Sequence, residues 1–232
     1  LGLGSDAEIL DYFGDDERMR ATIEKDAASN VEEGLIEVYK KLRPSEPPTV
    51  DSAQTHINNL FFDPGRYDMS RVGRYKYNKK LGIANRLEGQ VLAEPIANPR
   101  TGEVMALRDE KITKEKAFEI ENAGVKIAYV KAADETIVKV ISNGMVDIAC
   151  YVDFDAEAEC DIKENVRFDV LCEILDSCEN EDDLKEMLRS RADELVPNHI
   201  TVDDIFATIN YLNCVAHGVG NTDDIDHLGN RR

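Results

Sequence analysis

The sequence contains no long hydrophobic run. Its longest apolar stretches, Val138–Ile141 and Met145–Val152, are short, and Asp147 interrupts the second. A helix needs about 20 consecutive apolar residues to cross a bilayer, so we expect no membrane contact. The first residues, Leu1–Asp6, contain neither a basic region nor an apolar stretch, and the chain does not begin with Met. We therefore expect no secretion signal, and a piece excised from a longer chain.

Cysteine is scarce, and its spacing carries no known signature. The five cysteines form an odd set without a C-x-x-C pair, and of the four histidines only His217 lies near one of them, Cys214. This spacing excludes the usual zinc sites and a secreted disulfide framework. We expect reduced thiols in a cytosolic protein. The cysteines are Cys150, Cys160, Cys172, Cys178 and Cys214.

Motifs of catalysis are also missing. The sequence has no phosphate-binding loop, dinucleotide fingerprint, H-E-x-x-H, G-x-S-x-G or EF-hand loop. Two acidic clusters are the remaining candidates for metal binding. Five acids alternate over Asp153–Asp161, which fits either a calcium site on a strand or a solvated strand edge or loop. Three carboxylates lie within Asp223–Asp226, which could bind magnesium.

Positive charge is in deficit, but unevenly along the chain. The net charge of −19 argues at first against nucleic acid, because Lys and Arg drive phosphate binding. Residues 143–195 hold seventeen acids against five bases, whereas residues 43–86 hold eight bases against four acids. The acidity is therefore regional, which suggests two parts with different surroundings.

The first eighty residues have the spacing of helices. Val31, Leu35, Val38 and Leu42 repeat with helical period. Three prolines interrupt the series and predict a rigid, extended connector over Arg43–Thr49. The predicted helices are Asp6–Phe13, Glu17–Asp26, Val31–Leu42, Val50–Phe61 and Met69–Leu81.

After about Ile83 the period changes to that of strands. Asn98–Gly102 has the composition of a hairpin turn, between strands at Gln90–Ala93 and Val104–Leu107. Gly124 is expected to close a helix that begins at Thr113. The remaining predicted elements are strands at Lys126–Val130, Thr136–Ile141 and Met145–Asp153, a helix at Glu181–Leu195, and a helix from an N-cap at Thr201 through Ala216.

These elements predict an α+β fold in which helical ends enclose a β-rich, acidic middle. Such an order is typical of a domain inserted into a surface loop of another domain.

Two segments carry a family resemblance. The first includes R-P-S-E-P-P-T at Arg43–Thr49, N-L-F-F-D-P-G-R-Y-D at Asn59–Asp68 and V-G-R-Y-K at Val72–Lys76. The second is D-D-I-D-H-L-G-N-R-R at Asp223–Arg232. Their order and spacing resemble the β subunit of bacterial RNA polymerase, where R-P-G-E-P-P, N-L-F-F, R-Y-D-L-x-x-V-G-R and the same final ten residues occur. The departures are small: Ser45 replaces the usual glycine and Met69 the usual leucine.

The resemblance implies three parts. Residues 1–82 would be the first arm of the helical β lobe, and residues 198–232 its return arm, ending in the motif of the fork region. Residues 83–197 would be an insertion of the firmicute type, whose D-P-x-T-G-E motif is similar to Asn98–Glu103. Such an insertion resembles a small β-rich module of sandwich or barrel type, the β–β′ module. The resemblance assigns no functional residue to its second half, residues 141–196.

The resemblance also implies a function. The family synthesises RNA on a DNA template as a nucleotidyltransferase, with its catalytic magnesium held by another subunit, so neither a catalytic residue nor a metal site is expected here. The lobe would contact downstream and non-template DNA, with Arg43 and Arg66 as candidates for phosphate binding. Arg43 adjoins the connector, and Arg66 is expected at the start of a basic helix. Salt bridges to nearby acids are the alternative for both.

The closing motif would help to bind an unstacked non-template base through Ile225, Asp226 and Arg231. A carboxylate can accept hydrogen bonds from the guanine edge, an arginine can hold a phosphate, and an isoleucine can pack on a ring. This interpretation displaces magnesium binding. Since the rest of the pocket lies elsewhere in the β subunit, we expect negligible DNA affinity for the chain alone.

The resemblance implies, as partners, the β′, α and ω subunits, the σ factor and DNA, in the cytoplasm at the bacterial nucleoid. Two interpretations of the acidic insertion stay open: a docking surface for a transcription factor, or a solvated spacer. A stand-alone acidic protein-binding module related to the lobe is the alternative for the whole chain.

Overall fold

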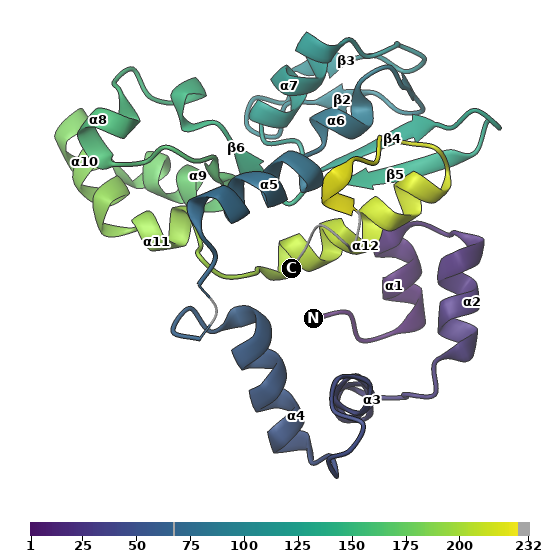
Figure 1. Ribbon diagram of the computed structural model, residues 1–232. Helices are drawn as coiled ribbons and strands as arrows, with labels where there is room; N and C mark the ends of the chain where they lie inside the picture. The colour runs from purple at the N-terminus through teal and green to yellow at the C-terminus, as the bar shows by residue number, and fades with distance from the viewer. Residues whose placement is uncertain (67, 227–232) are drawn as a thin grey trace. The chain divides into compact units, whose positions relative to one another are not determined.

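The chain forms two compact units in the computed structural model, which describes residues 1–66 and 68–226, except for the side chain of Ile225 (Figure 1). The first unit joins Leu1–Met69 to Asn198–Val202. The second joins Ser70–Pro197 to the residues from Asp203 onward. Each unit is therefore built from two separate stretches of the chain.

The first unit is helical, and local side-chain caps explain where its helices begin. A side-chain oxygen of Ser5, Asp16, Asn30 or Thr49 accepts a hydrogen bond from a first-turn backbone amide in each case. The helices confirm the predictions in this region to within a few residues. They are α1 (Asp6–Phe13), α2 (Glu17–Lys25), α3 (Val31–Leu42), α4 (Val50–Ile57) and the π-helical turn η1 (Asn58–Phe62), which continues α4.

The connector between α3 and α4 is held by polar contacts. The Tyr39 hydroxyl donates to Glu46 at 2.7 Å, and its ring packs edge-on against His56, with centroids 5.6 Å apart. The returning chain adds two backbone hydrogen bonds, from Met69 N to Asn198 O at 2.6 Å and from Ile200 N to Phe61 O at 3.0 Å. Tyr39 thus ties the connector to α3, and the returning chain is tied to the segment that follows α4.

The second unit contains a three-stranded antiparallel sheet in the order β1 (Val91–Leu92), β4 (Ile127–Lys131), β5 (Ile137–Ile141). Residues from this sheet pack with α6 (Ala84–Leu87) and α7 (Lys114–Asn122) in one apolar core. α7 begins after Thr113 and ends before Gly124, which has a φ of +82°, as predicted.

The predicted hairpin forms with a different first strand. β2 (Ile96–Ala97) pairs with β3 (Val104–Ala106) around the Asn98 turn, where the Asn98 side chain accepts from the Arg100 amide at 2.8 Å. The strand predicted at 90–93 is present as β1, but it pairs with β4. Pro95 separates β1 from β2, which gives the chain a bend between the two sheets.

The second half of the insertion is helical, which corrects the predicted β-rich module. The strand expected over 145–153 shortens to β6 (Met145–Val146), followed by η2 (Ile148–Cys150), and β6 pairs with β7 (Val166–Arg167). The helix expected over 181–195 divides in two, and two helices were missed. The helices here are α8 (Ala156–Cys160), α9 (Phe168–Ser177), α10 (Glu181–Ser190) and α11 (Ala192–Leu195).

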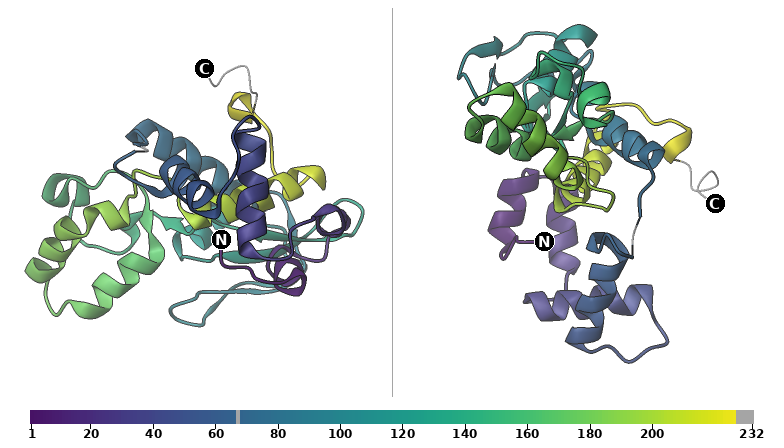
Figure 2. Two further views of the ribbon diagram at one scale, coloured as in Figure 1. Left: turned by 90° about the horizontal axis from the view of Figure 1, so that it is seen from below. Right: turned by 90° about the vertical axis from the view of Figure 1, so that its left-hand side faces the viewer.

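This helical group has an apolar core of its own. Val170, Leu171 and Ile174 of α9 are buried against Leu188 and Leu195 from the following helices. In the view from below, the green helices α8–α11 lie together at one side (Figure 2, left). The sheets of the described residues contain three, two and two strands and form no closed barrel. The α+β class is therefore confirmed, and of the two predicted types the closed barrel is not present among the described residues.

α5 (Arg71–Leu81) and α12 (Val202–Ala216) join the insertion through buried polar groups. Arg74 Nη1 donates to Asp204 Oδ2 at 2.8 Å, and Asn143 Nδ2 donates to Asp204 Oδ1 at 3.0 Å. All three side chains are buried, so their hydrogen bonds replace lost hydration. α5, α12 and the loop after β5 consequently meet at one buried ion pair.

A second buried contact connects α6, β5 and α12. Arg86 is 1% exposed and donates to Asn210 Oδ1 and to the carbonyls of Leu81 and Ile141, each at 2.8 Å. Burial lowers the pKa of Arg86. The amide of Asn210 also accepts from Ile141 N at 2.8 Å and donates to Lys139 O at 2.7 Å, so it pairs with the β5 edge as another strand would.

Candidate nucleic-acid interface

Asp226 lies in a polar cluster that fastens the closing motif to two helices. It belongs to the short 3₁₀ helix η3 (Asp224–Asp226). Lys80, from the last turn of α5, donates to Asp226 Oδ2 at 2.8 Å, and Tyr211 of α12 donates to Asp226 Oδ1 at 3.0 Å. The backbone amide of Asp223 donates to Asp226 Oδ2, also at 2.8 Å. The carboxylate is thus held from three directions.

Lys80 is the common partner in this cluster. Its ammonium group also forms an ion pair with Asp223 at 3.0 Å and lies 3.4 Å from the Asn221 carbonyl. The same nitrogen lies 5.5 Å from the centre of the Tyr211 ring, within the range of a cation–π contact. The side chains of Lys80 and Asp226 are 13% and 20% exposed. Water therefore screens this pair less than it screens a surface pair.

These contacts keep both groups of the pair charged. Burial by itself would raise the pKa of Asp226, but the hydrogen bonds from Lys80, Asp223 and Tyr211 outweigh it and lower that pKa. Burial would lower the pKa of Lys80, and its hydrogen bonds to Asp226 and Asp223 instead raise it. Burial and the hydrogen bond to Asp226 raise the pKa of Tyr211. Asp226 is therefore an ionised hydrogen-bond acceptor at neutral pH.

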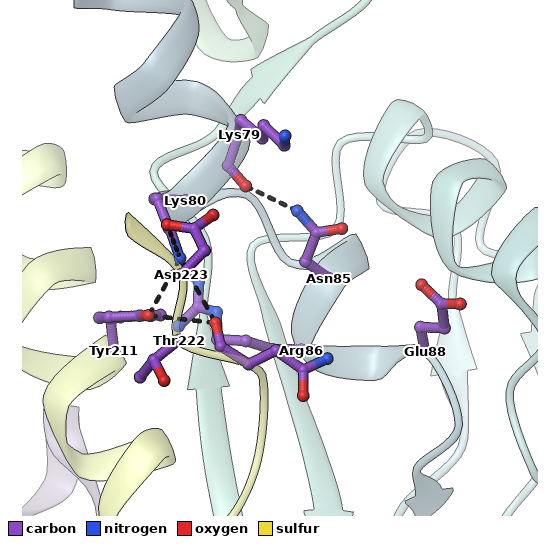
Figure 3. Close-up of a pocket in the computed structure, with 9 residues that line it drawn as sticks. Lys79, Lys80, Asn85, Arg86, Glu88, Tyr211, Thr222 and Asp223 are labelled. Atoms are coloured by element: carbon purple, nitrogen blue, oxygen red, sulfur yellow. Dashed lines mark hydrogen bonds and ion pairs between the residues drawn. The ribbon is translucent and has the colours of Figure 1, made fainter. Parts of the chain in front are cut away.

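A small cavity borders the cluster. It has a volume of about 170 Å³ and is lined by side chains of both charges, among them Lys79, Lys80 and Asp223. Figure 3 shows Lys80, Tyr211 and Asp223 close together, with Asn85 directed toward the Lys79 carbonyl. That amide donates to Lys79 O at 2.7 Å. Polar groups thus line a hollow beside the held carboxylate.

The hydrogen bonds limit what Asp226 can still accept. A carboxylate offers about four acceptor positions, two on each oxygen. Lys80 and the Asp223 amide take both positions on Oδ2, and Tyr211 takes one on Oδ1. Among the residues that the structure describes, no further donor contacts Oδ1, which leaves one of its positions for an external donor.

Arg43 and Arg66 lie in the first unit, each beside a nearby acid. Arg43 donates to Glu46 at 2.9 Å, and its side chain is 50% exposed. Arg66 Nε lies 3.9 Å from Asp63, and its side chain is 68% exposed. Arg66 occupies a turn before α5, which begins only at Arg71, so its predicted position at a helix start is wrong. Exposed pairs such as these are weak and exchange readily with other partners.

Arg43 also borders an open groove of about 500 Å³ in the first unit. Tyr39, His56 and hydroxyl side chains of α4 contribute to the same groove. The other two predicted site residues fall outside the description: Arg231 lies beyond the described residues, and the side chain of Ile225 is not described. Of the described side chains, Arg43 and Arg66 belong to the first unit and Asp226 to the second.

The alternating acids of 153–161 do not form a strand. Asp155 caps α8, and Glu157 and Glu159 pair with lysines from neighbouring segments. Over residues 1–66 and 68–226, no group of three His, Cys, Asp or Glu side chains has the geometry of a metal site.

All five cysteines are free thiols. In the part of the chain that the structure describes, no helix is long and apolar enough to span a bilayer.

Lys80 and Tyr211 are the site residues that the sequence did not reveal. They lie 146 and 15 residues from Asp226 along the chain, in helices whose charge and period suggest ordinary surface and core positions. The spacing contained no signal for either contact. Both depend on how α5 and α12 pack.

Comparisons with known proteins identify a family for this chain. The model of the family "RNA polymerase Rpb2, domain 2" matches residues 1–96 and 150–232. It leaves out 97–149, which lies inside the predicted insertion. The three-part division at residues 82 and 197 stays a prediction.

Three relatives named "DNA-directed RNA polymerase subunit beta" align over the whole chain. They come from Clostridium acetobutylicum and Clostridioides difficile, each 52% identical, and Clostridium novyi, 53% identical. The alignments cover 100% of this chain and only 18–19% of each relative. The chain therefore belongs to the RNA polymerase Rpb2 domain 2 family, as a segment of an RNA polymerase β subunit.

Proposed function

We propose that this chain is the DNA-contacting lobe of an enzyme that synthesises RNA on a DNA template. The family and the printed name of the relatives support this activity, a nucleotidyltransferase reaction. In this proposal the catalytic carboxylates and their magnesium belong to another subunit, and this chain contributes contacts with DNA. The match over the full 232 residues favours the β-subunit segment over a stand-alone acidic module.

The observation that carries the proposal is the held carboxylate of Asp226. An ionised carboxylate accepts hydrogen bonds and donates none, which suits the N1–H and N2–H₂ edge of guanine. Lys80 and Tyr211 fix its position, and one acceptor position on Oδ1 stays open. We assign Asp226 to the recognition of an unstacked non-template guanine, and assign Ile225 and Arg231 to the same pocket from the family resemblance.

Arg43 and Arg66 are proposed to bind DNA phosphates. Their exposure and their weak local ion pairs support this role, because a phosphate can replace Glu46 or Asp63 without uncovering a buried charge. The acidic surface of residues 143–195 opposes DNA. The contact with DNA would therefore be confined to the basic part of the lobe.

We further propose that the chain binds other polymerase subunits, namely β′, α, ω and the σ factor, in the cytoplasm at the bacterial nucleoid. The insertion would offer a docking surface for a transcription factor. The buried contacts of Asn143 with Asp204, and of Ile141 with Arg86 and Asn210, favour a fixed surface over a loose spacer.

The test uses RNA polymerase assembled with a full-length β subunit. Arg43→Ala and Arg66→Ala should each weaken DNA binding and reduce the slope of log affinity against log salt by about 1, because each removes one phosphate contact. Arg20→Ala is the matched control, since Arg20 is an exposed arginine of the same unit, paired with Asp15. Unchanged salt slopes in both variants would contradict the assignment of phosphate binding.

A further inference from the structure

Asp226 cannot present both carboxylate oxygens to a ligand in the observed arrangement. Oδ2 accepts from Lys80 and from the Asp223 amide, each at 2.8 Å, so its two acceptor positions are filled. Oδ1 accepts from Tyr211 at 3.0 Å and keeps one position. A guanine edge approaching Asp226 would therefore meet one oxygen, in an orientation that other residues determine.

The ammonium group of Lys80 has no spare donor. Its three protons face Asp226 at 2.8 Å, Asp223 at 3.0 Å, and the Asn221 carbonyl and Tyr211 hydroxyl at 3.4 Å. Lys80 is thus committed to holding residues 221–226 and is poorly placed to bind DNA itself. Its side chain is 13% exposed, which fits an internal role.

Without Lys80, the carboxylates of Asp223 and Asp226 would lose the cation that lies between them. The Lys80 ammonium bridges Asp223 and Asp226 directly. Mutual repulsion would then separate those two side chains and release the segment from α5. Tyr211 would still hold Oδ1, but it also lies 3.3 Å from the Asn221 carbonyl and could rotate toward it.

We propose that Lys80 and Tyr211 are positioning residues that set the base preference of Asp226. The inference rests on the proposed function of Asp226. Lys80 neutralises the paired carboxylates and fills Oδ2, and Tyr211 orients Oδ1 so that its open position faces the incoming base. Neither residue touches the base. Preorganisation of this kind lowers the entropy lost when the base binds.

The experiment uses RNA polymerase assembled with full-length β subunits. Complexes are formed on DNA scaffolds that carry guanine or adenine at each non-template position of the downstream bubble edge in turn. The readout is the ratio of dissociation rates for adenine and guanine at the most sensitive position. A well-placed base contact gives a ratio of about 5 to 150. A general loss of stability would change both rates and leave their ratio intact.

Lys80→Met retains the aliphatic stem and removes the charge, and it should bring the ratio down at least fivefold, toward 1. Lys80→Arg should recover most of the preference, because it restores the cation. Tyr211→Phe should lower the ratio in part, and it tests the same proposal if Lys80→Met fails to assemble. Lys76→Met, which alters an exposed lysine one turn earlier on α5, should leave the ratio unchanged.

Asp226→Asn separates this inference from the proposed function. If Asp226→Asn leaves the ratio unchanged, Asp226 does not read the base and the proposed function fails. If Asp226→Asn abolishes the ratio while Lys80→Met and Tyr211→Phe retain it, the proposed function stands and the positioning role is refuted. An increased guanine preference in Lys80→Met would also refute the positioning role. That result would mean that Lys80 prevents Oδ2 from accepting a hydrogen bond from the base.

Discussion

The buried ion pair of Arg74 and Asp204 should be a main determinant of stability in the second unit. Both side chains are 2% exposed, and their charged atoms lie 2.8 Å apart. Asp204→Asn keeps the shape and places an uncharged amide opposite the guanidinium. Removing one partner of a buried pair costs about 3–5 kcal/mol, because the remaining charge stays desolvated. For a unit of this size, that loss lowers the melting temperature by about 6–20 °C.

The surroundings of the pair explain why the loss would not be relieved. Arg74 Nε donates to Pro197 O at 3.0 Å, which fixes the guanidinium between α5 and the end of the insertion. Asn143 Nδ2 donates to the other Asp204 oxygen. The arginine therefore cannot turn toward water without breaking contacts to segments more than 100 residues away in the sequence.

The assay is urea unfolding followed by circular dichroism, with Arg74→Met and the double variant completing a cycle. Arg74→Met/Asp204→Asn should cost less than the sum of the two single variants by about 1–3 kcal/mol, because it leaves no unpaired charge. Glu119→Gln, which breaks an exposed pair with Lys116, is the control and should stay within about 0.5 kcal/mol. Additive effects, or a loss below about 1 kcal/mol for Asp204→Asn, would refute the reasoning.

Three further predictions concern the backbone, pH and DNA affinity. Gly124→Ala should destabilise the second unit by about 2–5 kcal/mol in thermal unfolding. The reason is that φ is +82° at this position and that the new Cβ would overlap the Phe168 ring. An unchanged melting temperature would contradict this tight packing. Burial raises the pKa of Glu121, so the stability that its protonated form contributes is fully present below the unfolded pKa of about 4.3 and is lost as pH rises through the folded pKa. Glu121→Gln should therefore flatten the stability–pH profile between the unfolded and the folded pKa of Glu121, and an identical profile in urea titrations would argue against a raised pKa of this buried carboxylate. The isolated chain should show negligible DNA affinity in low-salt gel shifts, and tight binding specific for single strands would overturn that expectation.

The helices of the first unit were predictable because their signals are local. α1 and α3 occupy the predicted residues, since caps at Ser5 and Asn30 lie one residue before each helix. The π-helical turn after α4 was not predictable, because the helical period continues through 58–62. Local chemistry fixed where most helices begin and only approximately where they end.

Strand pairing and the second half of the insertion were less accessible. The residues of β1 have strand character, but whether they pair with β3 or β4 depends on the bend at Pro95 and on the core beneath the sheet. α9 lies outside the predicted elements, although Val170, Leu171 and Ile174 have the spacing of one face of a helix. Short apolar runs fit either a strand or a helix, and the burial of their side chains in the folded protein decides between the two.

The sequence by itself determined the family, through two motifs whose residues are contiguous, and it determined the capped helices, whose interactions span one turn. Only the tertiary structure decided the environment of Asp226. Lys80 approaches it across 146 residues of chain, and Tyr211 reaches it from a separate helix. No local pattern encodes such contacts, because they arise only after packing brings α5 and α12 together. The sequence thus identified, by resemblance, a carboxylate that we assign to base recognition, and the fold shows it held by Lys80, Tyr211 and the Asp223 amide.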